Sequence, residues 1–432
     1  MITLLLCVCL IIFLLSFFIE PIKLNPLTIF FGEWTIIIFL VSLKLYGILP
    51  VSDKFFQMIL IGSVMFFLGF YLFKVFNNIA MTRIGTVNRP NYEYVINDRV
   101  VKFLIIVSLI FFSIDFFKSL IYFVQGYSLN HIRQVAQSGA LFSNPVMNAI
   151  RIIIAAPFSL ALTPLVAANF FSKRRNNFYI LGTLLILLMR LFSDGGRSPI
   201  IYLILCMFIS YVFHNFNGKR SKLTFKRVIV IKSQQLFIIA FLIASCIGIY
   251  LITKSRSGED TIRDTYYYFA MEPYMFQKWA NIVDSKNMMA FGMATFNGFL
   301  FPLSYLLANI VPGVGYFTAW RNVYEVIEGL GTQWQVITSY GTSANSYVSI
   351  FWTFYFDGRL LGIIIGMFCY GIFMAYFYFK VLKNRSEKNI ALYSMVLIGL
   401  FYSFQQMIFQ NIYWSLGFLM LLTILYKKER RK

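Results

Sequence analysis

The segment KSRSGEDTIRDTYYYFAMEPY at 254–274 mixes the three kinds of side chain that a sugar-phosphate reaction needs. Guanidinium groups can bind a diphosphate, a carboxylate can remove a proton from a sugar hydroxyl, and aromatic rings can pack on sugar faces. Solvated charges that pair with one another are the alternative for any single residue. The catalytic candidates are, in order, Asp264, Glu259 and Glu272, and the binding candidates are Arg256, Arg263 and Tyr267.

Three further arginines are candidates for binding a diphosphate or a sugar. Arg197 lies in a turn, SDGGRSP, whose glycines let the chain reverse and hold the arginine at the head of the next helix. Snorkelling to lipid headgroups is the alternative for this residue. Arg190 lies inside the preceding apolar run, where an ionisable group is a functional candidate. Arg133 is preferred to its neighbour His131, because no second histidine or acidic pair completes a base or metal site.

Two other charged positions have open interpretations. Asp115 lies inside an apolar run without an obvious partner, so a neutral carboxyl and a functional one are both possible. Asp357 and Arg359 are expected at the edge of the membrane, paired with each other. The glycines that follow them predict close packing of helices; they are Gly362, Gly366 and Gly371.

The composition indicates that the chain is an integral membrane protein. Of 432 residues, 59% are hydrophobic and only 13% are charged, which is more apolar surface than a soluble core can bury. The net charge of +21 does not indicate nucleic acid binding, because the basic residues lie in short segments between apolar runs. All five cysteines fall inside apolar runs, so neither a disulfide framework nor a metal site is expected. We expect no cofactor.

Apolar runs of the length needed to cross about 30 Å of hydrocarbon predict an all-α polytopic membrane protein with about eleven transmembrane helices. The first run lacks a basic leader and a cleavage site, so we expect it to be retained. We expect a single membrane domain over 1–432. The runs lie near 2–19, 29–49, 55–73, 100–124, 148–170, 178–193, 198–214, 235–253, 358–379, 389–409 and 411–426.

The positions of lysine and arginine predict the orientation, because cytoplasmic loops retain positive charge. An amino terminus outside the cell puts all five basic connections in the cytoplasm, together with the carboxyl terminus. The same count puts 254–345 outside as one large loop region. Within it, 291–314 is apolar but interrupted by glycine and proline, which favours a re-entrant or interfacial helix. The basic connections are 74–99, 173–175, 219–232, 380–388 and 427–432.

Four short motifs carry a resemblance to a known family: NPLTIFFGEW at 25–34, GGRSP at 195–199, FG at 291–292 and NSYVSIFWTFYFDGRLLG at 345–362. With this layout, the chain resembles the O-antigen polymerase (Wzy-type oligosaccharide repeat unit polymerase) family. The resemblance implies a glycosyltransferase of lipopolysaccharide or related polysaccharide biosynthesis in the bacterial inner membrane. It would transfer the growing glycan from undecaprenyl diphosphate to the non-reducing end of a new lipid-linked repeat unit. The implied partners are this lipid-linked oligosaccharide, membrane lipids and a chain-length regulator protein.

Two other functions remain open. An O-antigen ligase shares the many-span layout, but its family relies on a histidine in the large loop, and 254–345 contains none. A transporter or flippase of the same lipid-linked oligosaccharide would usually show internal repeats and ionisable groups at mid-bilayer. No repeat is visible in this sequence. We therefore expect the polymerase.

Overall fold

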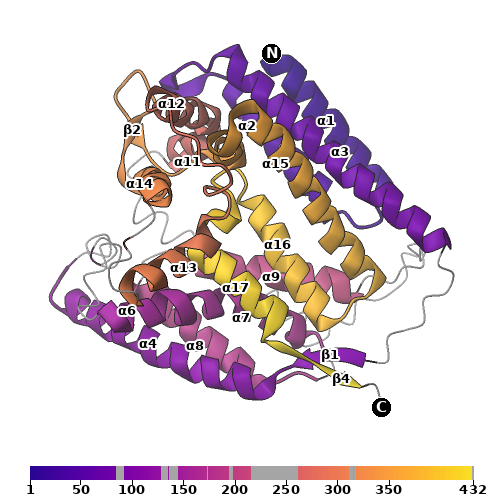
Figure 1. The fold of residues 1–432 in the computed structure, drawn as a ribbon, viewed down its shortest axis with the longest axis vertical. Coiled ribbons are helices and arrows are strands. Elements are labelled where there is room, and N and C mark those ends of the chain that lie inside the picture. The colour runs from indigo at the N-terminus through magenta and orange to yellow at the C-terminus, as the bar shows by residue number, and fades with distance from the viewer. Residues whose placement is uncertain are drawn as a thin grey trace.

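The computed structural model describes residues 1–83, 92–127, 135, 145–172, 174–193, 198–215, 261–310, 315 and 318–430. These residues are mostly helical, as predicted (Figure 1). The helices are α1 (Ile2–Ile19), α2 (Pro26–Ser42), α3 (Asp53–Arg83), α4 (Asp98–Val124), α6 (Pro145–Ile150), α7 (Ala156–Phe170), α8 (Asn177–Ser193), α9 (Ser198–Asn215), α11 (Thr261–Ala270), α12 (Glu272–Ser285), α13 (Asn297–Ile310), α14 (Thr318–Thr332), α15 (Ser349–Lys383), α16 (Glu387–Phe401) and α17 (Ile412–Thr423). A π-helical turn, Arg151–Ala155, joins α6 to α7.

Six helices in the described part of the chain are long and apolar enough to cross a membrane. Four shorter apolar helices accompany them, so the membrane class is supported while the count of eleven spans is not established. The expected run at 235–253 lies outside the described residues. The six are Ile2–Ile19, Asp53–Ile79, Asp98–Val124, Met147–Phe170, Ser198–Asn215 and Ser349–Lys383, and the shorter four are Pro26–Ser42, Asn177–Ser193, Asn297–Ala308 and Ile412–Thr423.

Polar caps explain where several helices begin. The Asn25 side chain accepts a hydrogen bond from the Thr28 amide at 2.9 Å, and Pro26 occupies the first turn of α2. Asn411 caps α17 in the same way, through the amides of Tyr413 and Trp414. These side chains satisfy amides that have no partner within the helix.

Two predicted spans have different boundaries from those expected. The span at 358–379 belongs to a longer helix, α15, which is broken at Gly358 and Arg359, where Arg359 has a φ of +54°. The span at 389–409 ends as a helix at Phe401. The irregular backbone that follows is paired with the start of α15, because the Ser349 and Ile350 amides donate to the Gln405 and Ser403 carbonyls. Non-helical backbone within an apolar chain is tolerated where protein satisfies it in this way.

The helices form two groups joined by α16 (Figure 1). One group contains α1, α2, α3 and α15, and the other contains α4, α7, α8, α9 and α17. Within the first group the backbones of α3 and α15 touch. A Cβ atom on Gly69 would lie 2.1 Å from the Phe368 carbonyl oxygen, and one on Gly371 would lie 2.3 Å from that of Phe66. The close packing predicted for Gly371 is therefore confirmed.

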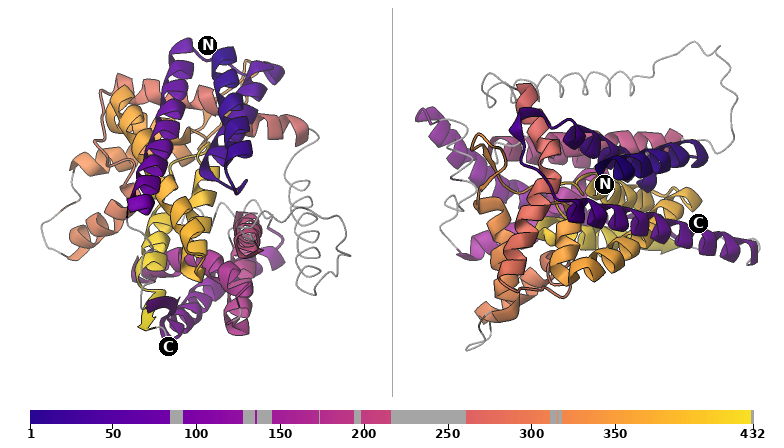
Figure 2. Two further views of the ribbon diagram at one scale, coloured as in Figure 1. Left: turned by 90° about the vertical axis from the view of Figure 1, so that its right-hand side faces the viewer. Right: turned by 90° about the horizontal axis from the view of Figure 1, so that it is seen from above.

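The connections separate onto two sides of the molecule. Strand β1 (Tyr92–Ile96) pairs antiparallel with β4 (Tyr426–Arg430), and we call their side the β1–β4 side. Helices α11, α12 and α14 lie away from it, on what we call the α11–α14 side (Figure 2). Residues from three of the basic connections, 74–99, 173–175 and 380–388, line one cavity; they include Glu93, Arg174 and Lys383. They therefore share a side, as the orientation argument requires.

The large loop region forms helices on the α11–α14 side. Within the expected interfacial segment, α13 is a short helix that packs on α17. A Cβ atom on Gly298 of α13 would lie 2.4 Å from the Ser415 hydroxyl oxygen at the beginning of α17. Strands β2 (Gln335–Val336) and β3 (Ser343–Ala344) form a small hairpin beyond α14. Whether α13 enters the membrane stays a prediction.

Candidate functional site

Helix α11 presents the first two predicted site residues to the surface. The side chains of Arg263 and Asp264 are 46% and 43% exposed, and their charged atoms approach to 3.9 Å. Asp264 is therefore accessible to an acceptor hydroxyl. The same exposure fits a solvated ion pair, so Arg263 and Asp264 can be either substrate-contacting residues or a surface pair.

Tyr267 is not available for the sugar binding that was predicted for it. Its side chain is buried, and its hydroxyl donates to the Tyr46 carbonyl at 3.0 Å. Tyr266 is also buried and donates to the Leu40 carbonyl at 2.9 Å. These tyrosines fasten α11 to the end of α2 and the loop after it, so Tyr267 offers no open ring face to a sugar. The exposed ring of the three is Tyr268, which lies 5.5 Å from the ring of Tyr347.

Glu272 is placed in the interior instead of on the surface. It is the first residue of α12, it has no exposed area, and neither of its carboxyl oxygens makes a hydrogen bond to a described residue. Burial raises the pKa of Glu272 well above its usual range, and the neighbouring Ser349 hydroxyl only partly opposes this. An acceptor sugar cannot reach this carboxyl in the observed position, which leaves Asp264 as the described candidate for direct proton removal.

Arg190 is held within the group of helices formed by α4, α7 and α8. Its Nη1 atom donates to the Ser159 hydroxyl at 2.8 Å, and its guanidinium lies 5.6 Å from the centre of the Phe112 ring. Ser159 is buried in α7, and Phe112 is buried in α4. The arginine therefore does not simply extend to lipid headgroups.

Asp115 has a partner that the sequence analysis missed. Its Oδ2 atom lies 2.8 Å from Nε of Arg151, and the Asp115 side chain is fully buried. Arg151 begins the π-helical turn, a feature often found at functional sites. The sequence signal was available, because Arg151 is an ionisable residue inside an apolar run. Its pairing required the tertiary structure.

These two observations define one cluster, which we call the arginine site: Phe112, Asp115, Arg151, Ser159 and Arg190. Phe112 and Asp115 are one turn apart on α4, so Arg190 and Arg151 contact the same face of that helix. The three charged side chains of the site carry one net positive charge. Helices α4 and α8 both begin beside the cavity that β1 lines, near Asp98 and Tyr179, and Asp115 and Arg190 lie several turns further along them. The arginine site therefore lies away from the β1–β4 side.

The FG and FDGR motifs, far apart in sequence, are in direct contact. Both carboxylate oxygens of Asp357 accept hydrogen bonds from the backbone that follows Phe291. The Gly292 and Ala294 amides donate to Oδ1 at 2.9 Å, and the amide and hydroxyl of Thr295 donate to Oδ2. Gly292 has a φ of +89°, which glycine adopts without strain. Asp357 thus holds this turn against α15.

The expected pairing of Asp357 with Arg359 is wrong. Arg359 instead contacts the end of α12, with Nε 3.0 Å from Oδ1 of Asp284 and Nη2 donating to the Met288 carbonyl at 2.7 Å. The Tyr355 hydroxyl donates to the same carboxylate at 2.7 Å. Residues two apart do not face each other on a helix, and the break in α15 at Gly358 and Arg359 gives the Arg359 side chain a further change of direction.

The remaining predicted site residues, Glu259, Arg133, Arg197 and Arg256, lie outside the described residues. Their roles stay predictions. Among the residues that the structure describes, no three histidine, cysteine, aspartate or glutamate side chains are grouped as metal ligands would be.

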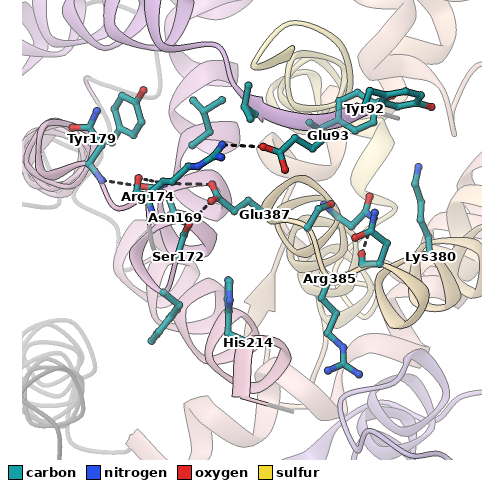
Figure 3. Close-up of a pocket in the computed structure, with 18 of the residues that line it drawn as sticks. Tyr92, Glu93, Asn169, Ser172, Arg174, Tyr179, His214, Lys380, Arg385 and Glu387 are labelled. Carbon is teal, nitrogen blue, oxygen red and sulfur yellow. Dashed lines mark hydrogen bonds and ion pairs between the residues drawn. The ribbon is translucent and has the colours of Figure 1, made fainter. Parts of the chain in front are cut away.

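A cavity of about 1470 Å³ lies on the β1–β4 side (Figure 3), and none of the residues of the arginine site lines it. Its polar side chains largely satisfy one another. Glu387 accepts hydrogen bonds from Asn169 and Ser172, and Arg174 lies 3.1 Å from Glu93. Among the predicted site residues that the structure describes, none lines this cavity. The size of this cavity therefore does not identify it as the site of the predicted glycosyl transfer.

Comparison with known proteins adds no relative. No protein-family model, no curated protein and no solved structure matches the chain.

Proposed function

We propose that the protein is a membrane glycosyltransferase that polymerises lipid-diphosphate-linked oligosaccharide repeat units in the bacterial inner membrane, as in O-antigen or related polysaccharide biosynthesis. The observation that carries the proposal is the arginine site, where Arg151 and Arg190 contact one face of α4 beside Asp115. A guanidinium in an apolar helix group must be balanced by an anion or by hydrogen bonds. A lipid diphosphate would supply an anion at the depth of the lipid headgroup.

The chemistry is consistent with this arrangement. The acceptor hydroxyl oxygen attacks the anomeric carbon of the donor, and the bond from that carbon to the diphosphate breaks. Planar guanidiniums match two phosphate oxygens at once and stabilise the charge that develops on the leaving group. Asp264, exposed on α11, would take the proton from the acceptor hydroxyl.

The proposal is tested with purified protein in vesicles that contain lipid-linked repeat units. We expect products that lengthen by whole repeat units, resolved by gel electrophoresis or mass spectrometry. An Arg321→Lys variant is a suitable control, because this arginine is exposed on α14 and pairs with Glu325. If intact protein supplied with the correct repeat unit forms no lengthened product, the polymerase proposal fails.

A second candidate, a transporter of the same lipid-linked oligosaccharide, is favoured by one observation. Ionisable side chains are buried among apolar helices, including the Asp115–Arg151 pair, and such groups often mark transport pathways. The same vesicles separate the two functions. Movement of labelled repeat units across the bilayer without any lengthening would identify a transporter.

A further inference from the structure

Two buried carboxyl groups from distant parts of the chain lie close enough to interact electrostatically. Glu33, in the NPLTIFFGEW motif, is on α2 and is 8% exposed. Glu272 begins α12 and has no exposed area. The turn after α16 brings them together: the Ser403 hydroxyl lies 3.4 Å from Glu33, and the ring of the next residue, Phe404, lies 5.4 Å from the ring of Phe269, three residues before Glu272. Two like charges in an interior of low dielectric repel strongly.

Most of the hydrogen-bonding capacity of this pair is unused. Glu33 Oε2 accepts a weak hydrogen bond from the Ser403 hydroxyl at 3.4 Å, whereas Glu33 Oε1 and both oxygens of Glu272 have no partner among the described residues. The Ser349 hydroxyl lies beside Glu272, is also fully buried, and forms no hydrogen bond of ordinary geometry. A pair of ionised carboxylates with so few donors would be strongly disfavoured.

The surrounding helices provide no countercharge within the described residues. Around α2 and α12 pack α1, α3, α11, α15 and α16. From α15, Tyr370 faces Glu33 and Ser349 faces Glu272; from the turn after α16, Ser403 faces Glu33. No described lysine, arginine or histidine from any of these helices acts on either carboxyl group.

We propose that Glu33 and Glu272 form a buried proton-binding site in which Glu272 is a neutral acid at neutral pH, joining α12 to α2 and α15. Glu272 has no exposed area, and a proton on Glu272 leaves Glu33 with the Ser403 hydroxyl as its donor. One proton removes the repulsion between the carboxyl groups and gives Glu272 a hydroxyl donor. This site does not depend on the polymerase proposal.

The site makes stability depend on pH with a definite sign. Glu272 keeps its proton in the folded protein, whereas in the unfolded chain it releases the proton above the ordinary glutamate pKa of about 4.3. The folded state therefore binds more protons than the unfolded state above that pH. Its stability must fall as the pH rises from there toward the folded pKa. When both carboxyl groups ionise, their repulsion separates α12 from α2.

The test compares the parent protein with Glu272→Gln in lipid nanodiscs. A glutamine is a neutral mimic of a protonated glutamate, so we expect the variant to fold. The matched control is Glu328→Gln, which alters an exposed carboxyl on α14. At neutral pH, infrared spectroscopy should show a carboxylic-acid C=O band in the parent and in the control, with reduced intensity in Glu272→Gln. The fall in thermal stability with rising pH should also be flatter in Glu272→Gln.

Three results would overturn the proposal. The first is an infrared band of equal intensity in all three proteins. The second is a Glu272→Gln variant that does not fold, because a neutral side chain would then be unsuitable for the site. The third is a band that disappears from the parent protein on addition of sodium or magnesium chloride at neutral pH, which would show that a metal cation occupies the site in place of the proton.

Discussion

At the scale of single residues, replacement of Arg190 tests whether its guanidinium binds a ligand or only packs between helices. We expect Arg190→Lys to lose about 10- to 100-fold in polymerisation rate, because a charged hydrogen bond contributes about 1.5–3 kcal/mol and lysine cannot reproduce the planar fork. Rates are measured in vesicles at equal protein amounts, with Arg321→Lys as the control on an exposed arginine. A rate for Arg190→Lys close to that of the parent would indicate that Arg190 only holds α4, α7 and α8 together.

Asp264 is the accessible carboxylate proposed as the general base. Replacement by asparagine keeps the shape of the side chain but removes its ability to take a proton. We expect polymerisation to fall by about 10² to 10⁴ fold while binding of the lipid-linked substrate persists. Glu328→Gln on α14 serves as the exposed control. Normal polymerisation by Asp264→Asn would move the role to a residue such as Glu259.

At the scale of elements, Asp357 joins the turn after α12 to the break in α15. We expect Asp357→Ala to lower the free energy of unfolding by about 3 kcal/mol or more, because the Gly292, Ala294 and Thr295 amides lose their acceptor. Asp357→Asn keeps one acceptor oxygen, so its free energy of unfolding should lie between that of Asp357→Ala and that of the parent. The measurement is thermal unfolding in detergent. An unchanged midpoint for the alanine variant would rule out this role.

The contact of α3 with α15 depends on glycine. Gly69→Val should destabilise the protein by about 1–3 kcal/mol, because the new side chain must push the Phe368 carbonyl away. The control is Gly331→Ala on α14, where a Cβ atom would lie 3.8 Å from its nearest neighbour. Folded yield after size-exclusion chromatography compares them. Equal yield and equal thermal midpoints would show that α3 and α15 can move apart at little cost.

At the scale of the whole molecule, the gathering of basic connections on the β1–β4 side predicts the orientation. Reporter fusions after Ser221 and after Ser285 should report opposite sides of the membrane, with the second outside. Ser285 ends α12 on the α11–α14 side, whereas Ser221 belongs to a basic connection. Fusions that report the same side would contradict the predicted topology.

The sequence alone determined the class of this protein and the approximate position of most helices. Long apolar runs bury their own backbone polar groups only as helices, so composition and run length suffice for that inference. Residue type also selected Arg190 as an ionisable group inside an apolar helix. The ends of α15 and α16 were not predictable, because a break at Gly358 and Arg359 and an irregular turn after Phe401 are stabilised by distant backbone.

Only the tertiary structure decided which charged residues meet. Asp115 pairs with Arg151, and Asp357 accepts hydrogen bonds from the turn after Phe291. Glu272 lies in the interior near Glu33 instead of on the surface. These partners are far apart in sequence, and no repeating pattern of residues links the segments that contain them. The energy of a charge depends on its burial and on the group that faces it, and neither is a local property of the chain.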